Sequence, residues 1–135
     1  MRIKRFQGLE VPVATGSTLT KFFFADQPQL RNAYIEAIQF YNINATPLSI
    51  LSGLPSVTDA DASKSYLTLY QGDLQLVYQL PIVAISNIVK GTGAYVFDLP
   101  SMNDQDISWT KSYISLPTAL ATTGVAYSFG VYYYM

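Results

Sequence analysis

The sequence predicts an all-β protein, a single-domain antiparallel β-sandwich of about eight strands. Three observations predict this class. Apolar and polar residues alternate with period two along most of the chain, as they do in strands that bury one face. Tyr and Phe, which favour strands, occur 11 and 7 times, and proline or glycine interrupts the alternation at short intervals. Because so many short strands need a sandwich or barrel to bury their apolar sides, the 135 residues are expected to form one domain, residues 1–135.

Each expected strand is bounded by turn-forming residues. The seven prolines fall between strands or at their starts, where a missing N–H group breaks no ladder. Residues 30–42 also fit the period of a helix, and a strand is the favoured interpretation there. Residues 44–64 are expected to form a long irregular excursion between two groups of strands. The expected strands cover residues 3–6, 19–25, 33–42, 65–71, 74–80, 94–99, 107–116 and 125–134.

The clearest local signal is a β-hairpin around Gly72. Two alternating runs, residues 66–71 and 74–78, flank the tripeptide Gln71-Gly72-Asp73. A tight turn between antiparallel strands needs a residue with positive φ, which glycine adopts without steric cost. The sequence therefore predicts that these two runs are adjacent antiparallel strands.

Composition argues against catalysis. The chain contains no His and no Cys, the side chains that perform most acid–base, nucleophilic and transition-metal chemistry near neutral pH. Its nine acidic residues are scattered and form no recognisable pair for glycoside hydrolysis. We therefore expect a protein that is not an enzyme and that needs no cofactor and no metal.

Charge is sparse and unevenly placed. Eight Lys and Arg against nine Asp and Glu give a net charge of −1, which does not favour sequence-specific nucleic-acid binding. Three of the basic residues are Arg2, Lys4 and Arg5, whereas residues 112–135 carry no charge. No segment is long and apolar enough for a transmembrane helix, and the amino terminus lacks the apolar stretch of a signal peptide. A surface with so few charges is expected to be partly covered by other chains.

Two short motifs match catalytic patterns only superficially. Ser108-Trp109-Thr110-Lys111 fits the Ser-x-x-Lys pattern of penicillin-recognising enzymes, but on a strand residues three apart point to opposite faces. Gly91-Thr92-Gly93 begins like a phosphate-binding loop and lacks the later glycine, the lysine and the following helix. A strand and a turn, respectively, are the favoured interpretations.

Three polar segments are interpreted as ordinary loops. Asp59-Ala60-Asp61 and residues 103–106 could supply oxygen ligands to calcium, but neither fits an EF-hand frame. Asp and Asn in turns usually bond to their own backbone. Asn44 begins a glycosylation sequon, which matters only in a eukaryotic secretory route, and the sequence shows no signal for one.

Aromatic residues near the carboxyl terminus are the candidates for an interface. Consecutive tyrosines on a strand point alternately to its two faces, so residues 132–134 cannot all enter one core. Rings on the other face need another partner, and flat rings could also stack on a sugar. The candidate subunit-interface residues are Tyr132, Tyr133, Tyr134, Trp109 and Tyr113. Arg2, Lys4 and Arg5 are candidate partner contacts at the amino terminus, although a solvated or acid-paired terminus is the simpler interpretation.

The second half of the chain resembles the small virion proteins of tailless icosahedral bacteriophages. The resemblance rests on YLTLYQGDLQLVYQL (66–80), the following Pro81-Ile82, and ISWTKSYISLP (107–117) ahead of an aromatic strand. It implies a single domain of jelly-roll type, with two facing sheets and eight strands. It also implies subunits that join side by side around a capsid axis, as a penton or minor capsid protein.

Taken together, these observations predict a structural protein of a virion that acts by assembly. Its expected partners are copies of itself, in a pentamer, and other capsid proteins. It is expected to be made in the host cytoplasm and to reside in the capsid; proximity to an internal virion membrane is left open. The alternative function is a non-catalytic carbohydrate-binding or receptor-binding β-sandwich of a spike or fibre.

Overall fold

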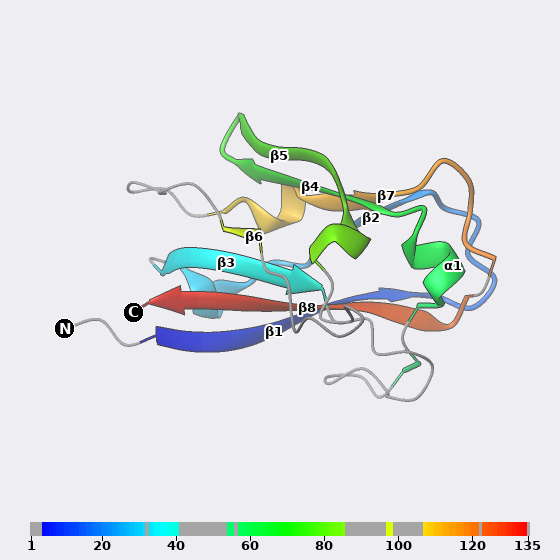
Figure 1. The fold of residues 1–135 in the computed structure, drawn as a ribbon, viewed down its shortest axis with the longest axis horizontal. Helices are drawn as coiled ribbons and strands as arrows, with labels where there is room; N and C mark the ends of the chain where they lie inside the picture. Colours follow the sequence, from blue (N-terminus) through cyan, green and yellow to red (C-terminus); the bar gives the residue numbers. More distant parts are fainter. Residues whose placement is uncertain are drawn as a thin grey trace.

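The protein is an all-β sandwich of two antiparallel sheets. A computed structural model describes residues 4–31, 33–40, 54–55, 57–85, 97–98, 107–121 and 123–134. Within these residues, eight strands form two four-stranded sheets, and Figure 1 shows them as two facing layers. Sheet A has the strand order β1-β8-β3-β6, and sheet B has the order β2-β7-β4-β5. The predicted fold class is therefore confirmed at the level of a two-sheet antiparallel sandwich.

The elements are short, apart from the two strands nearest the chain ends. The strands are β1 (Lys4–Val13), β2 (Lys21–Phe23), β3 (Tyr34–Phe40), β4 (Tyr66–Gln71), β5 (Leu74–Pro81), β6 (Phe97–Asp98), β7 (Tyr113–Ser115) and β8 (Val125–Tyr134). The helical turns are η1 (Pro28–Leu30), α1 (Asp59–Ala62), η2 (Ile82–Ile85) and η3 (Trp109–Lys111).

The strands pair in nested order, from the outermost two in the sequence to the innermost two. The first strand pairs with the eighth, the second with the seventh, the third with the sixth and the fourth with the fifth, all antiparallel. The β3–β8 and β4–β7 pairs then complete the two sheets. Residues far apart in sequence are thereby brought together along whole strands, as in the continuous ten-residue register between β1 and β8.

Several predicted elements are confirmed. β8 has the predicted bounds, and β4 and β5 form the predicted hairpin, with Gly72 at φ 61° in its turn. β3 is a strand and not a helix, because pairing with β8 and β6 on its two sides satisfies its backbone in the extended form. The excursion 44–64 lies largely outside the described residues; its last part contains α1.

Two predicted strand boundaries are wrong. β1 runs to Val13, beyond the predicted 3–6, although it contains Gly8 and Pro12. Pro12 is tolerated because β1 is an edge strand of its sheet, where an N–H group directed outward has no ladder partner to lose. In the predicted strand 107–116, only β7 forms a strand, because η3 precedes it. The Ser108 carbonyl holds that turn by accepting hydrogen bonds from the Lys111 and Ser112 N–H groups at 3.1 Å each.

Aromatic side chains fill the space between the sheets. Phe129 of β8 lies 5.4 Å from Phe24 and 5.3 Å from Phe40, measured between ring centroids, and Phe24 also contacts Trp109 at 5.6 Å. These rings come from four separate segments of the chain, so the core joins both sheets. Burial of one such side chain stabilises the fold by about 1.5–3 kcal/mol.

One buried hydroxyl network joins α1 to the core. The Ser65 hydroxyl donates to the Asp61 carbonyl at 2.8 Å, and the Ser65 and Tyr127 hydroxyl oxygens, 2.7 Å apart, share a second hydrogen bond. Burial and, to a smaller extent, the nearby Asp61 carboxylate together raise the pKa of Tyr127 to about 12, while the bond to Ser65 opposes the shift. Asp61 is itself buried, and its Oδ1 accepts from the Ala121 N–H at 3.2 Å. This aspartate has a structural role here, and the Asp59 side chain lies outside the described residues.

Candidate interaction surfaces

The three terminal tyrosines of β8 alternate between the two faces of sheet A. Tyr133 is only 7% exposed and belongs to the core, whereas Tyr132 and Tyr134 are half-buried on the outer face. Trp109 is 4% exposed and packs on Phe24. Tyr133 and Trp109 are therefore corrected from candidate interface residues to core residues, because both point between the sheets.

The amino-terminal cations are only partly described. The Arg5 side chain is exposed, and Lys4 pairs through its backbone with Tyr134 at the end of β1. Arg2 and the Lys4 side chain lie outside the described residues, as do the Gly91–Gly93 loop, residues 103–106 and the Asn44 sequon. The proposed partner contacts of the terminus stay a prediction.

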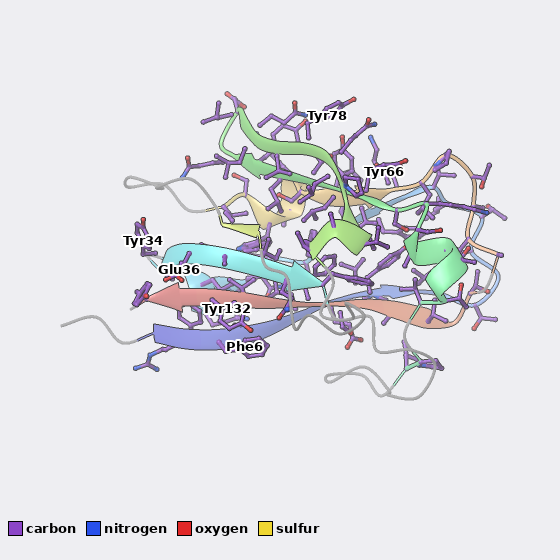
Figure 2. The ribbon with its side chains drawn as sticks, viewed as in Figure 1. Phe6, Tyr34, Glu36, Tyr66, Tyr78 and Tyr132 are labelled. Carbon is purple, nitrogen blue, oxygen red and sulfur yellow. The ribbon has the colours of Figure 1, made fainter. Side chains whose placement is uncertain are left out.

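Aromatic rings on the outer face of sheet A contact each other within the chain. Phe6 meets Tyr132 edge to face at a centroid distance of 5.4 Å, and the Tyr132 hydroxyl donates to Gln39 Oε1 at 3.2 Å. The ring centroid of Tyr34 lies 6.3 Å from that of Tyr134, its partner on the neighbouring strand. Figure 2 shows Phe6 and Tyr132 close together on the neighbouring strands β1 and β8. The outward rings of β8 thus have intramolecular partners.

The outer face of sheet B carries a row of three rings. We call Phe23, Tyr113 and Tyr70 the aromatic row: their centroids are 5.4 and 6.4 Å apart, and each comes from a different strand. The Lys21 ammonium lies 4.3 Å from the centroid of the Tyr113 ring, in cation–π geometry. At the other end, Gln75 Nε2 donates to the Tyr70 hydroxyl at 2.8 Å. Tyr113 is thus the one predicted interface residue on this surface.

The β4–β5 hairpin extends this surface. Tyr78 is 61% exposed, and Figure 2 shows it with Tyr66 on the side of sheet B that faces away from sheet A. A bulge interrupts the β4–β5 register here, and Gln79 takes φ 49° while its N–H donates to Thr68 Oγ1 at 3.2 Å. Because a bulge locally bends its strand, it sets the direction of the adjacent Tyr78 ring.

Sequence analysis did not single out Phe23, Tyr70 or Tyr78. A signal for one of them was present: Tyr66 and Tyr70 alternate with Leu67 and Leu69 along β4. Period-two alternation sends these two leucines inward and the two tyrosines outward. Tyr78 has the same parity as Leu76 and Leu80, so only the bulges of β5 turn it outward. Tyrosine is apolar enough for either side, so composition alone did not decide which residues were core.

The Ser-x-x-Lys motif holds the hairpin turn. Ser108 Oγ accepts from the Gly72 N–H at 2.9 Å, and Lys111 Nζ donates to the Gly72 carbonyl and to Asp73 Oδ1 at 3.4 and 3.2 Å. The expectation that the two side chains point to opposite faces of a strand is wrong, because η3 turns both toward Gly72. Ser108 and Lys111 thus form a clasp, a set of hydrogen bonds that joins the η3 turn to the hairpin turn. The two side chains do not form a nucleophile–base pair.

A small cavity lies at the η1 end of the sandwich. Its volume is about 70 Å³, and an ion pair between Arg31 Nη2 and Asp26 Oδ2, 2.9 Å long and solvent-exposed, borders it. A cavity of this size holds a few water molecules, at roughly 10–15 Å³ each. The lining residues are Asp26, Gln27, Leu30, Arg31, Ile107 and Trp109.

Two searches of the described part of the chain were negative. Among those residues, no group of three or more His, Cys, Asp or Glu side chains could hold a metal ion. No helix in the same segments has the length and hydropathy needed to cross a membrane.

Comparisons with protein-family models, with curated proteins and with solved structures find no match to this chain. The physical features of its surfaces are therefore the basis for a functional proposal.

Proposed function

We propose that this protein is a structural subunit of a viral capsid, of jelly-roll type, that acts by assembling with copies of itself. A penton or minor capsid position fits its size. A jelly roll has eight strands arranged as two Greek keys in two sheets. The pairing of first strand with last, second with seventh, third with sixth and fourth with fifth supports this type.

The observation that carries the proposal is the exposed apolar surface of sheet B. Phe23 and Tyr78 are 53% and 61% exposed, and they accompany the half-buried Tyr66, Tyr70 and Tyr113. An exposed apolar patch of this kind is typical of an interaction site. Covering apolar area contributes about 25 cal/mol per Å², so each large ring that a partner covers adds on the order of 1–2 kcal/mol before association costs.

Repetition makes such a contact effective in a shell. A heterologous contact, in which this surface meets a different surface of the next subunit, closes into a ring when the rotation allows it. The same apolar gain then recurs at every contact around the ring. A pentamer is the closed ring that we propose, with other capsid proteins at its rim.

Sugar binding by a spike or fibre module is the weaker candidate. Trp109, the strongest candidate for stacking on a pyranose, is buried. Within the aromatic row, Phe23 and Tyr113 are inclined by 59°, and Tyr70 and Tyr113 by 39°. Rings tilted in this way do not form a flat platform, whereas an irregular protein surface can pack into them.

The oligomeric state tests the proposal. We expect sedimentation velocity and native mass spectrometry of the purified chain to show concentration-dependent oligomers. Tyr78→Ser is expected to weaken assembly at least fivefold while the monomer keeps its melting temperature within a few degrees. Phe6→Ser is the matched control, because Phe6 is an exposed ring on the other sheet that already packs on Tyr132.

Two outcomes would contradict the proposal. One is a chain that stays monomeric up to millimolar concentration and does not enter particles when it is expressed with capsid proteins. The other is an equal loss of assembly for Phe6→Ser and Tyr78→Ser, which would remove the assigned role of sheet B. Chemical-shift changes at Tyr78 or Tyr113 on titration with oligosaccharides would favour the sugar-binding alternative.

A further inference from the structure

The outer edge of β2 has backbone hydrogen-bonding groups that no other described residue of the chain uses. The Phe24 N–H donates to the Ser112 carbonyl at 3.1 Å, and the Leu116 N–H donates to the Thr20 carbonyl at 2.9 Å. These bonds direct the even-numbered residues of the segment toward β7. In an antiparallel strand, successive residues direct their N–H and C=O groups to opposite sides. The groups of Lys21 and Phe23 therefore point away from β7, and β2 is the terminal strand of sheet B in the described residues.

The open edge has defined ends. Before it, the Leu19 N–H donates to Ser17 Oγ at 3.3 Å, and after it, Gln27 Nε2 donates to the Ala25 carbonyl at 3.1 Å. Side chains of the same segment thus satisfy these two groups. Within residues 19–25, all of which the structure describes, only Lys21 and Phe23 present both backbone groups outward.

The opposite edge of sheet B is unsuitable for strand pairing. β5 carries two register shifts against β4, a residue with positive φ at Gln79, and Pro81, which has no N–H. Bulges, prolines, short length and lysines are features by which sheet edges avoid pairing with another chain. β2 has neither a bulge nor a proline, and only its length of three residues and Lys21 oppose pairing, so the two edges of one sheet differ in the chemistry they offer.

We propose that two copies of this chain join β2 to β2 in antiparallel fashion about a two-fold axis. The hydrogen-bonding direction selects the register: Lys21 lies opposite Phe23 of the partner subunit, and Phe22 lies on the axis. Lys21 and Phe23 of each chain then form two hydrogen-bonded pairs, four N–H to C=O bonds in total. Sheet B continues into its copy as one eight-stranded sheet.

The side chains of this register are complementary. Lys21 and Phe23 are both exposed on the outer face, so each ammonium group meets a phenyl ring across the axis. Lys21 already contacts the Tyr113 ring, so pairing places it between two aromatic rings. The two lysines come within a diagonal neighbour distance of about 7–8 Å, and their repulsion is screened by salt. The pairing is therefore expected to strengthen as ionic strength rises.

This contact goes beyond the proposed function. It is isologous and uses the edge of the sheet, whereas the ring contact proposed above is heterologous and uses the face. Each contact can exist without the other, so the two are tested with different residues.

Proline at position 21 tests the edge contact directly. Lys21→Pro removes an N–H that points away from β7, so it costs no hydrogen bond within the monomer. Lys21→Ala is the matched control, because it removes the side chain and keeps the N–H. Sedimentation equilibrium is expected to show a dimer weakened at least tenfold in Lys21→Pro and less than threefold in Lys21→Ala. Equal dimerisation of Lys21→Pro and the wild type would overturn the proposal, as would a wild type that forms no dimer.

Cysteine cross-linking tests the register without relying on a proline variant. The wild-type chain has no cysteine, so Lys21→Cys combined with Phe23→Cys places four thiols at one two-fold contact. Opposite residues are near enough for a disulfide, whereas diagonal ones are not. Mild oxidation should convert the double variant, and neither single variant, into a covalent dimer. Failure of the double variant to cross-link would overturn the proposed β2–β2 register. The proposed function would still stand in that case if Tyr78→Ser weakens assembly as expected.

Discussion

The two sheets share one antiparallel pattern and differ in what lies on their outer faces. Along β8 of sheet A, the outward residues Ala126 and Ser128 are buried as completely as the inward residues that flank them. Along β4 and β5 of sheet B, outward residues are half-buried or exposed, and Tyr78 reaches 61%. A strand pattern therefore predicts which side of a strand faces the core, but it does not predict whether the other side faces water.

Local contacts explain part of the difference. The Ala126 N–H donates to the Pro55 carbonyl at 3.0 Å, and the Val57 N–H donates to the Ala126 carbonyl at 3.2 Å. The segment containing Pro55 and Val57 thus continues sheet A along β8 where β3 ends. Small outward side chains on β8 permit close approach, whereas the tyrosines of sheet B stand away from their strands.

The largest effect is expected from removing a ring between the sheets. Phe129→Ala leaves a cavity beside Phe24 and Phe40 and should lower the free energy of unfolding by about 3–5 kcal/mol. Phe23→Ala removes the same group from the outer face of sheet B, where it is 53% exposed, and should cost under about 1 kcal/mol. Urea denaturation of both variants checks the pair. Equal losses would mean that the outer face of sheet B is as fully packed in solution as the core.

The next effect concerns alkaline pH. The pKa of Tyr127 is raised to about 12 from 10.0, so the unfolded chain loses this proton before the folded chain does. The stability contributed by the protonated hydroxyl is complete below about pH 10 and is lost as pH rises toward 12, by roughly 1.4 kcal/mol per pH unit. Tyr127→Phe lacks this dependence.

Comparison of the two proteins from pH 9 to pH 12 isolates this tyrosine from the other ten. Tyr127→Phe should be less stable by about 0.5–1.5 kcal/mol at pH 9, because it loses the bond to Ser65. The deficit should shrink above pH 10 and reverse by about pH 11, because about 1.4 kcal/mol is lost from the wild type over that pH unit. Parallel stability curves for the two proteins would show that Tyr127 ionises as readily in the fold as in the unfolded chain.

The smallest effects concern the clasp on the hairpin of sheet B. Ser108→Ala removes a partly buried acceptor from the Gly72 N–H and should cost about 1 kcal/mol. Lys111→Ala removes an exposed ion pair with Asp73 and should cost about 0–0.5 kcal/mol, less at high salt. Thermal unfolding at low and high salt distinguishes them. A larger loss for the lysine variant would reverse the assigned order of the two contacts.

Much of the fold was predictable because strands are a local pattern. Alternation located all of β8, and glycine at position 72 located the hairpin turn. Errors arose where one residue type suits two environments. Pro12 indicates a break in a strand, but on an edge strand it breaks nothing; Trp109 and Tyr133 are typical of interfaces and equally of cores.

The sequence by itself determined the fold class, the hairpin and the alternation of Tyr132, Tyr133 and Tyr134, because backbone geometry and side-chain period act over a few residues. Only the tertiary structure decided which face of each strand is covered and by what. Pairing of β1 with β8, about 120 positions apart, and of β2 with β7 joins distant residues that no local pattern specifies. The exposed aromatic row and the open edge of β2 exist only once those pairs have formed, because each is defined by which neighbours a strand has and which it lacks.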